Sequence, residues 1–221
     1  MSSPRPRDSQ RARVYRAELP LAASPLPGLP ACARFAERVV GTLWWDGRFP
    51  ALTQDRIPRF RPGNGARTAY FTDADVGDDW TITLPRRYRT KGIVLHELAH
   101  WALADQRDLP THGATFTRLV LDATAEFCGP ERADALTGAY RAERVRVGAP
   151  PRQGPDGRWR YGWDERLRLS LQRAVAIRAG AAPTVTGVLE AIEGEARLVV
   201  RAGDSTHRIE TTAVWSVEPA A

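Results

Sequence analysis

The sequence predicts an α+β protein, in which a larger part that mixes helices with a few short strands precedes a small, β-rich, barrel-like module. Apolar residues recur at helical spacing in several segments before residue 147, and short alternating runs separated by tight turns follow residue 184. A stretch rich in glycine and proline at residues 148–157 predicts a linker between them. We therefore expect one domain over residues 8–147 and a small second module, of unassigned role, over residues 158–221.

Five segments have the apolar spacing and the end signals of helices. They are residues 10–18, 31–45, 90–105, 113–128 and 131–144. The stretch from Pro20 to Pro30 holds four prolines and a glycine, which predicts a loop. Residues 1–7 are rich in proline, arginine and serine, and we expect a disordered tail there.

Strand-like runs occur on both sides of the linker. In the first domain they are residues 57–61, 68–72 and 80–84, which we expect to form a small mixed sheet packed on the helix over residues 90–105. In the second module they are residues 185–190, 197–201, 207–211 and 214–217. Residues 164–178 fit either a strand or a helix. Leu167, Leu169 and Leu171 alternate as in a strand, whereas Leu167, Leu171, Ala174 and Arg178 recur at helical spacing. We predict a helix.

The composition bounds the class of protein. It is 43% hydrophobic and 26% charged, as in ordinary globular chains, and no apolar run approaches the ~18–20 residues of a membrane span. The basic start of the chain lacks the apolar stretch of a secretory signal, so we expect a cytoplasmic protein without membrane contact. Cys32 and Cys128 stand alone, which excludes a zinc ribbon or a disulfide scaffold.

The net charge of +6 comes almost entirely from arginine. Such a balance fits contact with nucleic acid or with an acidic partner. The arginines are spread over every segment, however, and no basic stripe interleaved with aromatic residues stands out. Nucleic-acid binding and a merely basic surface therefore both remain open.

The most informative stretch is the H-E-x-x-H pattern of His96, Glu97 and His100. Histidines four residues apart lie on one face of a helix, where two imidazoles can bind a Zn²⁺ ion at about 2.0–2.1 Å each. His112 follows after a short loop and is a candidate third ligand. A catalytic zinc keeps its fourth position for water, whose proton Glu97 would take as the general base.

Two other readings of this stretch remain open. A pair of helical histidines can serve packing alone, and a structural zinc would need a fourth protein ligand. Asp105 and Asp108, in the loop before His112, are the candidates for that ligand or for hydrogen-bond partners of the imidazoles. The fourth histidine, His207, is expected to be a strand residue far from the site.

The motif resembles that of the SprT-like zinc metalloproteases, and more closely that of a family of uncharacterised actinobacterial metallohydrolases. The first likeness rests on the run from His96 to Trp101 and on His112-Gly113-x-x-Phe116. The second also takes in the run from Arg7 to Tyr15, Trp44-Trp45 before Arg48-Phe49-Pro50, and Trp80-x-Ile82-x-Leu84-Pro85-x-x-x-Arg89. It covers about residues 7–146. It implies a zincin-like domain, zinc on His96, His100 and His112, and an acid/base role for Glu97.

The resemblance also implies partners. SprT-like members cut proteins bound to DNA, and many have a C-terminal zinc ribbon for which this chain lacks the cysteines. The repressor-cleaving ImmA/IrrE-like group shares the His-Glu-Leu-Ala-His motif, but the His-Gly-x-x-Phe context favours the SprT-like side. In zinc peptidases of this shape an edge strand binds the extended substrate. Residues 80–84 are expected either to be that edge strand or to be a plain strand of the sheet.

The hypothesis from sequence is therefore a zinc-dependent metallohydrolase that cleaves peptide bonds in a protein or peptide. The first alternative is a non-catalytic, zinc-stabilised binding protein that acts through its C-terminal module. The second is a DNA-associated SprT-like or a repressor-cleaving ImmA/IrrE-like protease. Four residues could stabilise the oxyanion, and the sequence singles out none of them: Tyr70, Arg86, Tyr88 and Arg118.

Overall fold

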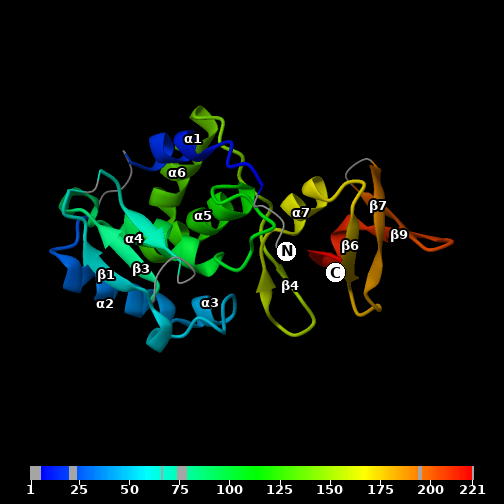
Figure 1. The fold of residues 1–221 in the computed structure, drawn as a ribbon, viewed down its shortest axis with the longest axis horizontal. Helices are drawn as coiled ribbons and strands as arrows, with labels where there is room; N and C mark the ends of the chain where they lie inside the picture. Colours follow the sequence, from blue (N-terminus) through cyan, green and yellow to red (C-terminus); the bar gives the residue numbers. More distant parts are fainter. Residues whose placement is uncertain (1–5, 20–23, 66, 74–78, 194–195, 221) are drawn as a thin grey trace.

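Two groups of elements lie side by side along the long axis of the molecule (Figure 1). The computed structural model describes residues 6–19, 24–65, 67–73, 79–193 and 196–220. It mixes helices with three small sheets, as the sequence predicts. Most of the tail predicted over residues 1–7 lies outside the described residues. Within them, the helices are all too short or too polar to cross a membrane.

The helices agree with the predicted segments except in two places, the segments predicted over residues 31–45 and 164–178. They are α1 Arg11–Glu18, α2 Leu29–Val40, α3 Leu43–Asp46, α4 Lys91–Ala102, α5 Ala114–Cys128, α6 Pro130–Ala142 and α7 Trp163–Leu169. The segment predicted as one helix over residues 31–45 is two helices, α2 and α3. The break occurs because Gly41 ends α2 and the hydroxyl of Thr42 accepts the N–H of Trp45 at 3.2 Å, which caps a new helix.

The first sheet has the order β1-β3-β2, with β1 Arg59–Pro62, β2 Tyr70–Thr72 and β3 Thr81–Leu84. Strand β3 is parallel to β1 and antiparallel to β2, so the sheet is mixed. Of the two alternatives for residues 80–84, the plain strand of the sheet is right and the edge strand is wrong, because β3 is central and all four of its residues are buried. Strand β2 is the edge nearer to α4.

Helix α4 lies between two apolar clusters. On one side Leu95 and Leu98 pack with α2 and the first sheet, and on the other Ala99 packs with α1, α5 and α6. Its sequence is apolar almost all round, which is typical of a helix enclosed by protein rather than one with a solvent face. The H-E-x-x-H motif is therefore carried by the most enclosed helix of this part of the molecule.

The second group of elements is an antiparallel sheet with the order β10-β6-β7-β8-β9. Its strands are β6 Ala174–Ala179, β7 Val185–Glu193, β8 Arg197–Ala202, β9 Ser205–Glu210 and β10 Val214–Pro219. Register shifts in the β7–β8 and β10–β6 pairs bend it. Strands β9 and β10 are its two edges, so the described part of the sheet is open rather than closed into a barrel.

The prediction of a helix over residues 164–178 is right for its first half only. Helix α7 ends at Leu169, and β6 follows. Val175 and Ile177 alternate into the core and are fully buried, which strand pairing on both sides of β6 requires. Leu167, on α7, packs into the same apolar core as these two strand residues.

The segment between the two groups is a short hairpin. Strand β4 Arg152–Gln153 pairs with β5 Trp159–Arg160, and the backbone N–H of Trp159 donates to Gly47 at 3.0 Å. Tyr161 then packs in the cluster of α5 and α6, with its hydroxyl 3.0 Å from the Asp122 carboxylate. Residues just before the second sheet therefore pack against the helices of the first part.

Candidate metal centre

The structure brings the three predicted histidines together. His96 and His100 lie on α4, and His112 lies at the end of the loop that leads into α5. One ring nitrogen of each is within 4.8 Å of the others, and the Nε2 atoms of His96 and His100 are 3.1 Å apart. Tetrahedral zinc with bonds of about 2.0–2.1 Å needs nitrogens roughly 3.4 Å apart. The three imidazoles lie close enough to bind a metal ion.

Carboxylates from the start of the chain orient two of these imidazoles. The Nδ1 atom of His96 is 2.5 Å from Glu18, and the Nδ1 atom of His112 is 2.7 Å from Asp8. A ligating imidazole normally gives its second N–H to such a partner, which leaves the other nitrogen free to face a metal. Glu18 is buried and also accepts the hydroxyl of Tyr140, so its position is set by two partners.

Asp105 and Asp108 do not have the role that the sequence allowed them. Asp105 is exposed, and Asp108 pairs with Arg166 at 2.6 Å. The N-cap of α1 is Gln10. The amide of Gln10 donates to the backbone oxygen of His112 at 2.8 Å, which joins α1 to the third histidine. Sequence reasoning missed Glu18 entirely, since no spacing rule links it to the motif.

The start of α5 is held by a second remote carboxylate. Both oxygens of Glu165, on α7, accept backbone N–H groups, from Ala114 at 2.9 Å and from Thr115 at 2.7 Å. These are N–H groups that the first turn of a helix leaves without an intrahelical partner. A Cβ atom on Gly113 would lie 2.5 Å from Glu165, which explains the glycine directly after His112.

Glu97 lies in the wall of the same site. It is buried, one oxygen has no hydrogen-bond partner within the described part of the chain, and the backbone N–H of Phe71 donates to its carboxylate. Burial raises its pKa to about 7 despite the opposing charge of His96. A divalent cation at the imidazoles would lower this pKa again, because an adjacent positive charge favours the ionised carboxylate.

The pKa values of the two oriented imidazoles are shifted in opposite directions. Burial opposes the charged form of His96, but the charge and hydrogen bond of Glu18 outweigh it and raise its pKa. Burial lowers the pKa of His112, and its Nε2 atom is buried with no hydrogen-bond partner among the described residues. An unpaired buried nitrogen of this kind is costly unless something binds it, so this atom fits a metal ligand.

A cavity of about 430 Å³ opens beside the histidine cluster, and His100 and His112, but not His96, are among the described residues that line it. Its walls come from α1, the loop before α5 and the edge strand β2, which contributes Tyr70, Phe71 and Thr72. Tyr70 is the one predicted oxyanion candidate that lines it within the described chain. Arg118 instead pairs with Asp122 on its own helix, and Arg86 and Tyr88 lie in the short 3-10 helix before α4.

Tyr15 also lines this cavity, although the sequence did not single it out as a site residue. Its ring centroid is 5.5 Å from that of His96 and 5.2 Å from that of His112. Burial raises the pKa of the Tyr15 hydroxyl, and the nearby charge of Glu97 raises it further. Helical spacing alone could not show that this face of α1 covers the metal centre.

Comparison with known proteins finds no matching family model, no matching curated protein and no matching solved structure.

Proposed function

We propose that the protein is a zinc-dependent metallopeptidase with a zincin-like first domain. The observation that carries this proposal is the cluster of His96, His100 and His112 beside the buried carboxylate of Glu97. His100, His112 and Glu97 line one cavity. Three neutral imidazoles with an adjacent carboxylate are the donor set of catalytic zinc sites that keep an open position. The buried, unpartnered Nε2 of His112 and the carboxylates on His96 and His112 support the same set.

The chain's own residues would divide the work as follows. When bound, zinc supplies a positive charge that polarises the scissile carbonyl and acidifies water. Glu97 takes the proton of the attacking water and passes it to the leaving amine. Glu18 and Asp8 hold the tautomers of His96 and His112. Strand β2 is the sheet edge beside Glu97, so it would pair with an extended peptide.

Metal content tests the ligand set. We expect the full chain to bind one zinc ion, and His112→Ala to lower the affinity by several orders of magnitude because it removes a ligand. His207→Ala is the matched control, since His207 is exposed on β9, away from the cluster. Elemental analysis with competitive chelator titration measures both. Full zinc affinity in His112→Ala would show that another residue is the third ligand.

Hydrolysis tests the role of Glu97. We expect Glu97→Gln to keep zinc and fold but to lose cleavage of unfolded protein substrates by at least ~10³-fold, because general-base catalysis is removed. Cleavage of casein or a quenched peptide library measures this. A wild type that cleaves nothing, together with unfolding on chelation, would instead support a non-catalytic, zinc-stabilised binding protein acting through its C-terminal module.

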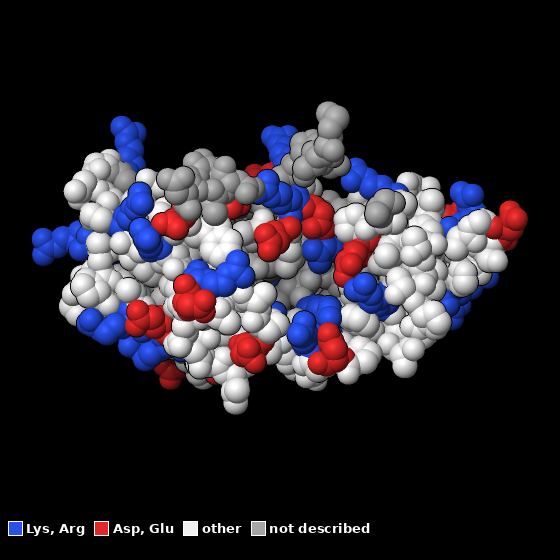
Figure 2. Space-filling view, turned by 60° about the horizontal axis from the view of Figure 1, so that its bottom comes forward, with Lys and Arg blue, Asp and Glu red and all other residues white. Residues whose placement is uncertain are grey.

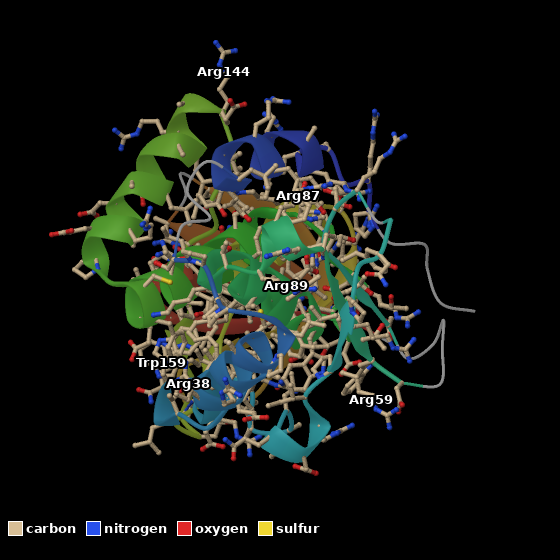
Figure 3. All side chains as sticks on the ribbon, turned by 90° about the vertical axis from the view of Figure 1, so that its left-hand side faces the viewer. Arg38, Arg59, Arg87, Arg89, Arg144 and Trp159 are labelled. Atoms are coloured by element: carbon tan, nitrogen blue, oxygen red, sulfur yellow. The ribbon has the colours of Figure 1, made fainter. Side chains whose placement is uncertain are left out.

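An association with nucleic acid is a second candidate function, and one observation favours it. A cavity of about 840 Å³ is lined by Arg67, Arg86, Arg87 and Arg89, and no carboxylate is among its lining residues within the described chain. Figure 3 looks onto the end of the molecule, opposite to the C-terminal sheet, where Arg87 and Arg89 lie. On the face in Figure 2, by contrast, basic and acidic residues are interspersed.

Salt dependence tests this second candidate. Binding of a fluorescent single-stranded or duplex DNA should weaken steeply between 50 and 200 mM salt if phosphates are contacted, through counterion release. Arg87→Ala should reduce the salt slope by about one. DNA binding that does not depend on salt, or no DNA binding even at low salt, would contradict a role of this basic surface in nucleic-acid binding.

A further inference from the structure

The proposed function still lacks a donor for the oxyanion. When water attacks a peptide carbonyl, the C–O bond forms, the π pair moves to the carbonyl oxygen, and that oxygen becomes negative. Preorganised hydrogen-bond donors at this position are among the largest contributions to catalysis. Glu97 handles the proton of the water, so a hydrogen bond to the oxyanion would have to come from another side chain beside the metal ion.

Tyr15 is the side-chain donor most closely joined to the metal centre. Its ring stacks on that of His96, with an interplanar angle of 28°, and meets the ring of His112 at 63°. It lines the cavity together with Glu97, and its hydroxyl is near enough to Glu97 to feel the charge of that carboxylate. Tyr70, the other phenol in the cavity wall, lies on the edge strand and is 47% exposed.

We propose that Tyr15 donates its hydroxyl proton in a hydrogen bond to the oxyanion of the tetrahedral intermediate, as a catalytic residue of the proposed peptidase. Tyr15 keeps its proton throughout. The proton of the water passes to Glu97 and then to the leaving nitrogen as the C–N bond breaks. This inference rests on the proposed function, since it assigns a residue to the same reaction.

Arg11 is the positioning residue for Tyr15. It lies one helical turn before Tyr15 on α1, lines the same cavity, and places its guanidinium carbon 5.5 Å from the centroid of the tyrosine ring. A cation over an aromatic ring at this distance restrains the ring. Arg11 therefore acts through Tyr15, and its removal should affect turnover only while the tyrosine hydroxyl is present.

The decisive variant is Tyr15→Phe, which removes the hydroxyl and keeps the ring that packs on the histidines. We expect kcat to fall by about 10²–10³-fold, as when one oxyanion donor is lost, with KM, zinc affinity and melting temperature unchanged. The matched control is Tyr88→Phe, for which we expect less than a threefold change, because Tyr88 lies in the short 3-10 helix before α4 and is not among the described residues that line the cavity. Full activity in Tyr15→Phe, or loss of zinc together with activity, would overturn the proposal.

A binding measurement tests the inference without turnover. A phosphinic peptide imitates the tetrahedral intermediate, whereas a hydroxamate binds zinc without imitating it. We expect Tyr15→Phe to weaken the zinc-loaded protein's affinity for the phosphinic peptide by about 10²-fold and to leave hydroxamate affinity unchanged, by calorimetry. Equal affinities of wild type and variant for the phosphinic peptide would exclude the hydrogen bond.

The role of Arg11 is read from a double-mutant cycle. We expect Arg11→Met to lower kcat about tenfold in the wild type and to add nothing in the Tyr15→Phe background, with partial recovery in Arg11→Lys. Additive losses would show that Arg11 does not act through the tyrosine. If the wild type cleaves peptides and Glu97→Gln does not, while Tyr15→Phe is fully active, the peptidase proposal stands and the assignment of Tyr15 fails.

Discussion

The two ends of the molecule bury different kinds of side chain. Around the metal centre, four ionisable groups are almost fully enclosed: Glu18, His96, Glu97 and His112. The core of the C-terminal sheet is apolar, and its acidic residues form ion pairs at the surface, as Glu190 does with Arg201 and Glu210 does with Arg197. Burying ionisable groups costs free energy unless they are paired, so their concentration at one end marks a site rather than a stabilising core.

The strongest test of this contrast is a core truncation in the C-terminal sheet. Ile177 is fully buried in an apolar cluster, so Ile177→Ala should lower the free energy of unfolding by about 2–5 kcal/mol. Zinc affinity should not change, because this cluster contains none of the metal-centre residues. Denaturant unfolding and chelator titration measure the two quantities. Weaker zinc binding in the folded variant would show that the two ends are not independent.

The contribution of Glu97 to the free energy of unfolding should change with pH in the opposite direction to that of an ordinary paired carboxylate. In the metal-free protein the pKa of Glu97 rises from 4.5 to about 7, so folding favours the neutral acid. The folded state is therefore penalised as pH rises from 4.5 to 7, by up to roughly 3 kcal/mol above pH 7. Glu97→Gln should match the wild type near pH 4.5 and exceed it in metal-free stability at pH 8.

Thermal unfolding in a chelator over this pH range checks the prediction, and added zinc should reduce the difference at pH 8. An advantage of Glu97→Gln that is independent of pH would contradict the assignment of this titration to Glu97.

The carboxylate on His96 should matter more than a surface carboxylate on the sheet. Glu18→Gln keeps the size of the side chain but weakens the acceptor for Nδ1, so zinc affinity should fall by about 10–100-fold. Glu190→Gln is the matched control, because its exposed ion pair with Arg201 contributes less than about 1 kcal/mol. Equal zinc affinities of the two variants would mean that Glu18 serves packing with Tyr140 alone.

The smallest effect is expected at the junction of the two ends. Glu165→Gln leaves one of the two N–H groups at the start of α5 facing an amide instead of a carboxylate oxygen, which should cost about 1–2 kcal/mol of stability. Zinc affinity should also fall modestly, since the capped turn follows His112 directly. A loss of stability without any change in zinc affinity would limit Glu165 to a structural role.

Elements with a strong local signal were predicted well. The motif helix, the helices after it and the strands around Tyr70 and Ile82 all lie where the sequence placed them. The sequence did not predict strand β6. Its burial depends on pairing with β7 and β10, whereas residues 164–178 considered alone also fit the spacing of a helix. The sequence also left open whether residues 80–84 form an edge strand or a plain strand, since strand order is not a local property, and the structure makes them a central strand.

The sequence by itself predicted the cluster of three histidines, because helical periodicity brings His96 and His100 to one face and a short loop limits the reach of His112. Only the tertiary structure decided which groups surround that set. Glu18 meets His96 across 78 residues, Asp8 meets His112 across 104, and Glu165 meets Ala114 across 51. No repeat or spacing rule spans such separations, so these contacts follow only from the packing of α1 and α7 against the motif helix and its neighbour.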